Sequence, residues 1–361
     1  MTGRWDLVVV GGGPVGLAAA VAAARRGLRS VVVEQRTGPV DKACGEGLMP
    51  GTLRALADLG VDVDRDVGGA PFVGIRYVGP DGVTSAAHRF RAGPGRGVRR
   101  TTLHAALRRR ADEVGVTVLT GRVDDVQQDG ARVRVVVAAG TRPAGSGAGG
   151  TVEARWALAC DGLHSVLRRR LGLDAGTDGR RYGVRRHVAV RPWTDHVEVH
   201  WSADAEAYVT PVAAGEVGVA VLGPRGTDHA SALTAFPALA DRLAGAAWTT
   251  SVRGAGPLRR RVRGRVAGRV LLVGDAAGYV DALTGEGLRV GLASAEAAVA
   301  AVAAGRPQDY EAAWREVTRS YRWLTGALVT ATRAAPARRA LVPAAARAPR
   351  LFAAAVDTLA T

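Results

Sequence analysis

Three short stretches of glycine and acidic residues carry the side chains best suited to chemistry in this chain. The first is Gly11-x-Gly13-x-x-Gly16, which is followed by Glu34 at the end of an apolar run. The second and third are Asp161-Gly162 and Gly274-Asp275. Glycines let a backbone approach a pyrophosphate closely, and carboxylates accept hydrogen bonds from ribose hydroxyls. Together these residue types predict that the chain binds a dinucleotide.

The elements around the first glycine cluster must hold it at the end of a strand. An apolar run, 7–10, precedes the cluster, an alanine-rich helical segment follows it, and a second apolar run, 30–33, leads into Glu34. This order of strand, turn, helix and strand presents free N–H groups at the helix N-terminus to phosphates. The alternative, a glycine-rich turn without a ligand, is disfavoured by the surrounding pattern. The contacts expected here are Gly11, Gly13, Pro14, Val15, Gly16, Glu34, Gln35 and Arg36.

The third stretch repeats this arrangement near the end of the chain. A short apolar strand, 269–273, leads into Gly274-Asp275, and a long alanine-rich helix is expected over 286–304. Between them, 283–288 forms a glycine-containing turn at the helix start. Its N–H groups and the positive end of the helix dipole could stabilise negative charge. A plain helix-start turn is the alternative.

The order of these motifs resembles the FAD enzymes of the glutathione-reductase type. The resemblance covers about 5–304 and is closest to the branch shared by class A flavin monooxygenases and the geranylgeranyl reductase family. It implies that FAD extends over all three motifs, with Glu34 at the adenosine end, Asp161 near the pyrophosphate and Asp275 at the ribityl hydroxyls. It also implies that the turn at 283–288 lies beside the isoalloxazine ring. The further contacts implied are Arg100, Val123, Gly162, Gly274, Gly285, Glu286, Gly287 and Leu288.

The same resemblance places a short loop, 41–47, beside the flavin ring. Cys44 and Gly45 are therefore expected near the cofactor, and Cys44 near the substrate as well. A small buried thiol is the alternative interpretation of Cys44. Of Arg99 and Arg100, one is expected to reach the FAD phosphates while the other is solvated.

A β-rich insertion supplies further catalytic candidates. Strand alternation puts Tyr208 and Thr210 on one face of a strand, and Arg185 and His187 on one face of a neighbouring strand. His187, His200 and Tyr208 are candidates to bind or deprotonate a phenol or enol, although each, taken singly, is more commonly a packed or surface residue. The predicted catalytic residues are Cys44, His187 and Tyr208.

The expected fold class is α/β. The chain has 361 residues, 47% of them hydrophobic, which is enough for two joined domains. A Rossmann-like FAD-binding domain is expected to carry an inserted, mainly antiparallel β substrate domain and C-terminal helices. The segment 139–150 is expected to be a hairpin loop, and Thr101 or Thr102 to cap a helix. The boundaries are 1–70, 92–178 and 262–305 for the FAD-binding domain, 71–91 and 179–261 for the substrate domain, and 306–361 for the helical segment.

The net charge of +16 would suit a nucleic-acid partner, but the residues disfavour one. Lys42 is the only lysine, Ile75 the only isoleucine, and asparagine is absent, so codon composition explains much of the arginine excess. Aromatic residues, at 5%, are too few for a base-stacking platform. Cys44 and Cys160 lack metal-ligand spacing, so no metal site is expected. With no signal peptide and no long apolar run, the chain is expected to be cytoplasmic.

The tail, 309–361, predicts two or three basic amphipathic helices separated by Pro336, Pro343 and Pro349. Their arginines could cap a substrate tunnel, contact an anionic membrane surface, or be solvated. These arginines are Arg333, Arg338, Arg339, Arg347 and Arg350.

Three functions are compatible with these features. The favoured one is an NAD(P)H- and O2-dependent monooxygenase that hydroxylates a lipophilic aromatic or polyketide-type small molecule of secondary metabolism. The alternative, suggested by the loop 44–47, is reduction of isoprenoid C=C bonds; the lack of a proline in 281–283 and a shortened motif at 208–211 argue against it. The third is a non-catalytic flavin-binding electron-transfer or sensory module, which the full-length β insertion disfavours. Substrate identity, the choice of nicotinamide cofactor and the oligomeric state stay open.

Overall fold

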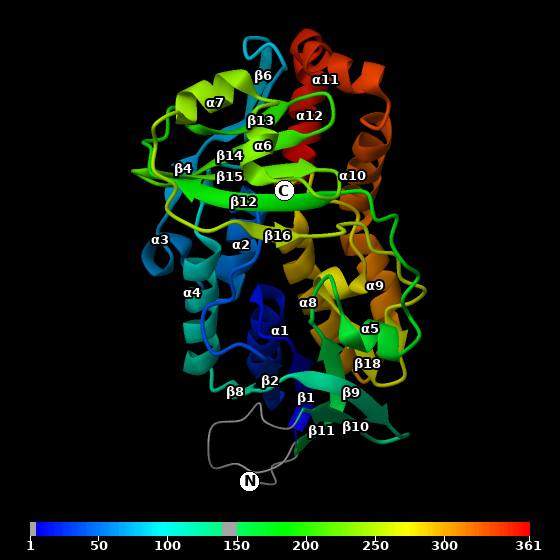
Figure 1. The fold of residues 1–361 in the computed structure, drawn as a ribbon. Coiled ribbons are helices and arrows are strands. Elements are labelled where there is room, and N and C mark those ends of the chain that lie inside the picture. Colours follow the sequence, from blue (N-terminus) through cyan, green and yellow to red (C-terminus); the bar gives the residue numbers. More distant parts are fainter. Residues whose placement is uncertain (1–4, 139–149) are drawn as a thin grey trace.

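The computed structural model describes residues 5–138 and 150–361, and a mainly parallel sheet lies in its lower half (Figure 1). Five strands of this sheet run parallel in the order β8-β2-β1-β11-β18, and β9 and β10 extend β11 as an antiparallel ribbon. Most of the predicted hairpin loop 139–150 lies outside the described residues. The strands are β1 (Trp5–Val10), β2 (Ser30–Glu34), β8 (Thr117–Thr120), β9 (Val123–Gln128), β10 (Val133–Val137), β11 (Gly150–Ala159), β17 (Val266–Ala267) and β18 (Val270–Leu272).

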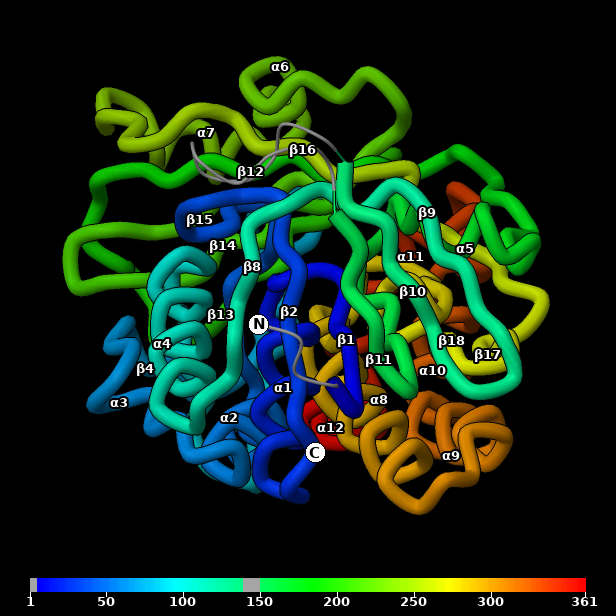
Figure 2. Tube along the Cα trace, turned by 90° about the horizontal axis from the view of Figure 1, so that it is seen from below, coloured from blue at the N-terminus to red at the C-terminus, as the bar shows by residue number. Residues whose placement is uncertain are grey.

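Three helices cover one face of this sheet, as the view from below shows (Figure 2). They are α1 (Pro14–Arg25), α4 (Arg100–Glu113) and α8 (Gly287–Ala303). The continuous apolar runs of β1 and β2 are fully buried, as expected for parallel strands that are covered on both faces. The small residues of α1 allow α8 to pack closely, and a Cβ added at Gly291 would lie 2.5 Å from Val15 Cγ2. This packing fixes the starts of α1 and α8, where cofactor contacts are expected.

A second, seven-stranded sheet lies in the upper half, in the order β16-β12-β15-β14-β13-β5-β6 (Figure 1). The mainly antiparallel pairing expected for the insertion is confirmed for β12, β13, β14 and β15. The chain also turns at 79–82, a Gly-Pro-Asp-Gly sequence typical of a hairpin, and pairs β5 with β6. One prediction was wrong: the strand of His187 does not neighbour that of Tyr208, because β15 lies between them. The strands are β5 (Gly74–Val78), β6 (Ser85–Arg89), β12 (Tyr182–Val188), β13 (His196–Trp201), β14 (Glu206–Ala213), β15 (Glu216–Gly223) and β16 (Arg253–Ala255).

A small sheet joins the two halves. It pairs β3 (Gly47–Leu48), β7 (Gly95–Gly97) and β4 (Ala70–Phe72), and the short helices α2 (Pro50–Asp58) and α3 (Val63–Asp66) lie between its strands in sequence. A Cβ added at Gly97 would collide with the carbonyl oxygen of Pro211, so the backbone of β7 passes directly against β14. The joint brings the loop at 41–47 against the seven-stranded sheet. The predicted domain boundaries are compatible with these sheets, but the division itself stays a prediction.

Helices cover both faces of the seven-stranded sheet. On one face lie α6 (His229–Leu233) and α7 (Pro237–Leu243). Leu233 of α6, Leu239 of α7 and Phe236 between the two helices pack against the valines of β14 and β15. On the other, residues of the C-terminal helices pack against Trp201 and Phe72. These helices are α9 (Asp309–Val317), α10 (Arg319–Ala331), α11 (Ala335–Arg347) and α12 (Pro349–Ala360).

Two predictions about helices are corrected by the structure. The tail forms four described helices instead of two or three. Pro343 does not separate helices but lies inside α11, although proline removes a backbone hydrogen bond. The packing of the adjacent Val342 in the apolar cluster around Trp201 offsets this loss. Pro336 and Pro349 sit in first turns, where proline is tolerated. Helix α4 begins at Arg100 with Arg99 as its N-cap, so neither Thr101 nor Thr102 caps it. None of the described helices is long and apolar enough to cross a membrane.

Candidate active site

The glycine loop after β1 has the shape of a phosphate cradle. Gly11 has a φ of +101°, and a Cβ there would lie 2.5 Å from the carbonyl oxygen of Cys160. A Cβ at Gly16 would collide with the carbonyl oxygen of Gly11, whereas Gly13 has nothing within 4 Å of its added Cβ. The first and third glycines are thus required by packing, and the second leaves the backbone open beside the N-terminus of α1.

Glu34 ends β2 and braces this loop. Its Oε2 accepts a hydrogen bond from Gly12 N at 2.7 Å, and its Oε1 accepts one from Arg36 N at 3.0 Å. The carboxylate keeps free lone pairs that could accept ribose hydroxyls. Behind the loop, His104 Nε2 lies 2.8 Å from Gly12 O. Burial lowers the pKa of His104, so the neutral ring donates this hydrogen bond.

The second motif follows β11 and leads into α5 (Val166–Arg170). Asp161 Oδ2 accepts from Leu167 N at 3.1 Å, while Oδ1 is buried and has no partner among the described residues. Burial raises the pKa of this carboxyl, although nearby hydrogen bonds oppose the shift. Buried Arg168 donates to Leu163 O at 2.8 Å and to Ala276 O at 3.2 Å. This arginine therefore ties the second motif to the third.

The third motif is the 3-10 turn η1 (Gly274–Ala277), directly after β18. Asp275 Oδ2 lies 3.1 Å from Lys42 Nζ, which brings the 41–47 loop over the turn. The chain then reaches Gly285, with a φ of +71°, and buried Glu286, which is the N-cap of α8. Burial raises the pKa of Glu286 in spite of the adjacent Arg289. The turn leaves the N-terminal N–H groups of α8 available to a ligand.

The predicted catalytic residues Cys44 and Tyr208 converge on the loops beside these motifs. Tyr208 OH donates a hydrogen bond to Leu283 O at 2.8 Å, and burial raises the pKa of this phenol well above its ordinary value. Its proton is therefore held, and the side chain fixes the turn that precedes α8. Cys44 is partly exposed, and its Sγ accepts from Glu46 N at 3.5 Å. Thr210 Oγ1 donates to Gly45 O at 2.8 Å, which pins the same loop to β14.

His187 is fully buried in a network of charged side chains. Arg185 Nη1 lies 3.0 Å from His187 Nδ1, and Thr250 Oγ1 lies 3.1 Å from the same nitrogen. Because Arg185 can only donate, Nδ1 accepts, and Nε2 donates to Glu46 Oε2 at 2.5 Å. Arg185 also pairs with Asp41 at 2.5 Å. Both ring nitrogens of His187 are thus engaged with protein groups, which suits positioning of the 41–47 loop better than direct contact with a substrate.

Other predicted residues lie in less direct positions. Arg99 is partly exposed and pairs with Glu216 at 2.7 Å. The Nε of Arg100 is buried without a partner among the described residues, and its backbone N donates to Glu46 Oε1 at 2.8 Å. His200 is buried and bonded to Glu198 at 3.0 Å. Gln35 and Arg36 are exposed, while Val123 is buried at the start of β9.

Sequence reasoning missed Glu46, which connects the two halves of the site. It is buried and adopts a φ of +58°, the only such value among the described non-glycine residues. Its position in the 41–47 loop was the available signal, but a glutamate gives no indication of a left-handed conformation. Its partners belong to α4 and β12, which are distant in sequence.

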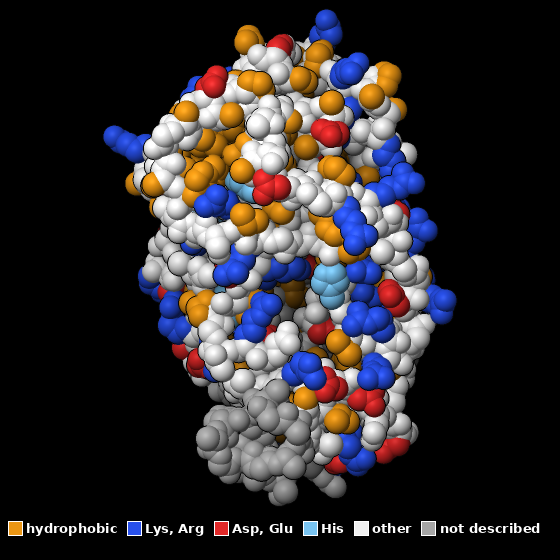
Figure 3. Space-filling model, viewed as in Figure 1, with side chains coloured by type: hydrophobic (Ala, Val, Ile, Leu, Met, Phe, Trp, Pro, Cys, Tyr) orange, Lys and Arg blue, Asp and Glu red, His pale blue; other side chains and the backbone are white. Residues whose placement is uncertain are grey.

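The described residues fit a dinucleotide cofactor. The backbone of the glycine loop is open at Gly13, and the carboxylates of Glu34 and Asp275 follow β2 and β18. Asp161 and Arg100 each keep a buried polar atom without a partner among the described residues. Figure 3 shows the molecule hollowed between its two halves, with Lys and Arg side chains gathered around the hollow. A family model described as "FAD binding domain" matches residues 4–306. The chain belongs to this FAD-binding family. It is therefore a member of a family of FAD-dependent oxidoreductases, and its cofactor is FAD.

Relatives of this FAD-binding protein include several reductases. Menaquinone reductase of Mycolicibacterium smegmatis is 32% identical over 87% of this chain and 80% of its own length. The chloroplastic geranylgeranyl diphosphate reductase of Oryza sativa subsp. japonica is 32% identical over 84% of this chain and 67% of its own length. Among solved structures, the flavin-dependent brominase Bmp2 is similar over 99% of this chain and 94% of its own, with a TM-score of 0.85 and 18% identity. The last similarity confirms the predicted α/β flavoprotein fold.

Proposed function

We propose that this protein is an FAD-dependent reductase that saturates a C=C bond in an isoprenoid chain. The observation that supports this proposal is the 32% identity to a menaquinone reductase over most of both chains, which exceeds the identity to the structurally similar brominase. The rice relative, whose name specifies reduction of geranylgeranyl diphosphate, supports an isoprenoid as the substrate class. This proposal departs from the monooxygenase that the sequence motifs favoured.

The residues that would hold FAD are those of the three motifs, with Glu34 toward the adenosine and Asp275 toward the ribityl chain. When bound and reduced, FAD would supply the hydride for one carbon of the double bond. The second carbon needs a proton, and the partly exposed Cys44 Sγ could supply it, since Lys42 and Thr210 hold its loop over the cofactor site. Buried Tyr208 keeps its proton and orients the turn at 283–288.

The experiment is anaerobic reduction of the FAD-loaded protein, followed by addition of a quinone with an unsaturated isoprenoid chain. The proposal expects flavin reoxidation with a product that, after its ring has been reoxidised to the quinone, is still heavier by two hydrogen atoms, as measured by mass spectrometry. Reduction of the quinone ring alone would not leave this mass difference. Cys44→Ser should slow reoxidation by about 10²-fold or more while flavin absorbance in the purified protein stays unchanged. Reoxidation only after oxygen is admitted, without saturation of the chain, would overturn the proposal.

A monooxygenase is the second candidate. Asp281-Ala282-Leu283 stands where the reductase branch has a proline, and Tyr208 to Pro211 is a shortened form of its aromatic motif. In this case NAD(P)H would reduce the flavin and O2 would be the co-substrate. Incorporation of labelled oxygen into a phenolic small molecule would distinguish this reaction from saturation of a double bond.

We also propose peripheral contact with an anionic membrane, through α11 and α12. Arg339, Arg347 and Arg350 are exposed, and Leu351 is 74% exposed beside them. Arg338 was wrongly counted among the free arginines, because it is buried and pairs with Glu206 at 2.8 Å. Co-sedimentation with phosphatidylglycerol vesicles at low salt tests the contact, and absence of binding there would remove it.

A further inference from the structure

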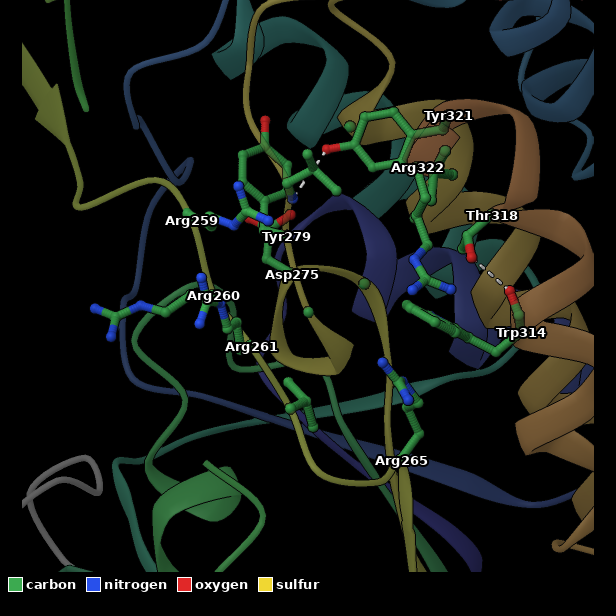
Figure 4. A pocket seen from close by; sticks show the side chains of 17 residues that line it. Arg259, Arg260, Arg261, Arg265, Asp275, Tyr279, Trp314, Thr318, Tyr321 and Arg322 are labelled. Atoms are coloured by element: carbon green, nitrogen blue, oxygen red, sulfur yellow. Dashed lines mark hydrogen bonds between the residues drawn. The ribbon is translucent and has the colours of Figure 1, made fainter. Parts of the chain in front are cut away.

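A cavity of about 240 Å³ lies between the segment 259–265, the start of α8 and the helices α9 and α10 (Figure 4). It shares Gly274, Asp275 and Gly287 with the third cofactor motif, so it adjoins the expected flavin site. Its lining is unusually basic. We call it the arginine cavity, after Arg259, Arg260, Arg261, Arg265 and Arg322.

Only one of these five arginines has an acidic partner among the described residues. Arg265 pairs with Glu311 at 2.8 Å and stacks on Trp314 at 3.8 Å from the ring centroid. The acid in the described lining, Asp275, is already paired with Lys42. The arginines that form no ion pair with any described residue are Arg259, Arg260, Arg261 and Arg322.

Two of the unpaired guanidinium groups, those of Arg260 and Arg322, lie near other positive charges. Arg260 Nη2 lies 3.1 Å from His164 Nδ1, and its Nε is buried without a partner among the described residues. Burial, and then the charges of Arg260 and Lys42, lower the pKa of His164, which keeps the ring neutral as an acceptor. Arg322 has its pKa lowered by burial and by the charges of Arg265 and Arg315. A folded protein tolerates such neighbouring cations where a bound anion offsets their repulsion.

The chemistry of the lining selects the anion. Guanidinium forks bind phosphate oxygens with paired hydrogen bonds, and several forks around one cavity suit a group with more than one negative charge. A volume of about 240 Å³ lies below the range of roughly 300–1,000 Å³ for sites that enclose a whole small ligand. The cavity therefore accommodates a charged head group whose remainder extends outside it.

We propose that the arginine cavity binds the diphosphate group of a second ligand, distinct from FAD. The glycine loop provides the cradle for FAD phosphates, and the Val15 side chain there packs against Gly274 and Gly291 of the cavity wall. Tyr279 lines the cavity, and its phenol, whose pKa is raised mainly by burial, has Cys44 among the neighbours that contribute to the shift. A ligand anchored here would extend toward Cys44 and the start of α8.

Two ligands of the proposed reaction carry this group, an isoprenoid diphosphate and a nicotinamide dinucleotide. The inference rests on the proposed function for this choice of ligands, but the binding of the group itself does not. The first test is titration calorimetry of the FAD-loaded protein with inorganic pyrophosphate. The double variant R259Q/R322Q, which changes opposite walls, should bind at least about tenfold more weakly than the wild type, since each charge-assisted hydrogen bond contributes substantially.

The matched control is R263Q. Arg263 is exposed in the same segment and does not line the cavity, and among the described residues its side chain donates only to Gly172 O, at 3.3 Å. It should leave pyrophosphate binding unchanged. Equal weakening in R263Q would show a nonspecific effect of charge, and loss of flavin absorbance from R259Q/R322Q would show that these arginines hold FAD itself. Either result overturns the proposal.

The source of the diphosphate is tested by displacement of pyrophosphate. Displacement by geranylgeranyl diphosphate but not by geranylgeraniol supports an isoprenoid substrate, and displacement by NADH or NADPH supports the hydride donor. Displacement by neither overturns the proposal. This measurement involves no turnover. The binding result can therefore be interpreted even if the proposed reductase activity is not found.

Discussion

Two groups of charged residues flank the expected cofactor site, and they differ in how their charges are paired. The buried network consists of Asp41, Glu46, Arg185, His187 and Thr250, and each of its charged groups contacts another member. In the arginine cavity, four guanidinium groups have no acid among the described residues. The 41–47 loop touches both groups, since Asp41 belongs to the network and the next residue, Lys42, pairs with Asp275 of the cavity lining.

This difference separates a structural role from a binding role. Charges that leave water must be compensated inside the protein, and the buried network supplies its own ion pairs, with only Arg185 Nε left without a partner among the described residues. These pairs hold the 41–47 loop against β12. The cavity keeps its charges partly hydrated, and their compensation is left to a ligand. Removal of a charge should therefore destabilise the fold in the network and leave it nearly unaffected at the four unpaired arginines of the cavity.

The largest effect is expected for Glu46→Ala. Glu46 accepts hydrogen bonds from Arg100 N and His187 Nε2, and it pairs with Arg185 at 3.6 Å. Its loss therefore leaves buried donors without a partner. We expect the free energy of unfolding to fall by about 3–5 kcal/mol, as measured by urea denaturation. Glu46→Gln, which keeps the size and one acceptor, should lose less. A fall below about 0.5 kcal/mol in the alanine variant would mean that the network does not hold the loop.

The contrast also explains what the sequence could predict. The glycine loop, β1 and β2 were predictable because local spacing and apolar runs dictate them, and the structure confirms these elements. The hairpin at 79–82 was equally local. Each of these features depends on residues that are close together in the chain.

The buried network was not predictable, because its members come from segments that only the fold brings together. Arg185 and His187 were correctly placed on one face, but nothing local indicates that Glu46 would reach them from more than 100 positions away. Arg338 was misjudged for the same reason, since its partner Glu206 belongs to β14. Charged residues in amphipathic segments are normally solvated, and only tertiary contacts reveal the exceptions.

A smaller effect is expected for His187→Ala. Glu46 Oε2 would lose a donor at 2.5 Å, which should reduce the free energy of unfolding by about 1–3 kcal/mol. The sharper measurement is a double-mutant cycle with Glu46→Ala, in which the double variant should lose less than the sum of the two single variants. Additive losses would show that the two side chains act independently.

The dependence of stability on pH should be smaller still. Burial alone would raise the pKa of Asp41, but the hydrogen bonds and charges of Arg253 and Arg185 outweigh it and lower the pKa. Asp41 therefore stabilises the fold above its unfolded pKa of about 3.9, and this contribution is lost as pH falls through the lower folded value. The free energy of unfolding, measured by urea denaturation, should fall less below about pH 4 in Asp41→Asn than in the wild type. The difference between the two should be about 1 kcal/mol or less. Identical declines would exclude Asp41 as a source of acid sensitivity.

The smallest effect on stability is expected for Arg322→Gln, and this makes it the decisive counterpart to Glu46→Ala. Arg322 is exposed, lacks an acidic partner among the described residues and is repelled by Arg265 and Arg315. Its neutralisation should change the free energy of unfolding by no more than about 0.5 kcal/mol in urea denaturation, with a gain favoured because repulsion is relieved. Arg265→Gln is the comparison within the same cavity, since it breaks the pair with Glu311 and a closer stacking on Trp314, at 3.8 Å against 5.1 Å for Arg322, and should destabilise. A loss for Arg322→Gln as large as that for Arg265→Gln would mean that the unpaired arginines support the fold, and the distinction between the two regions would no longer hold.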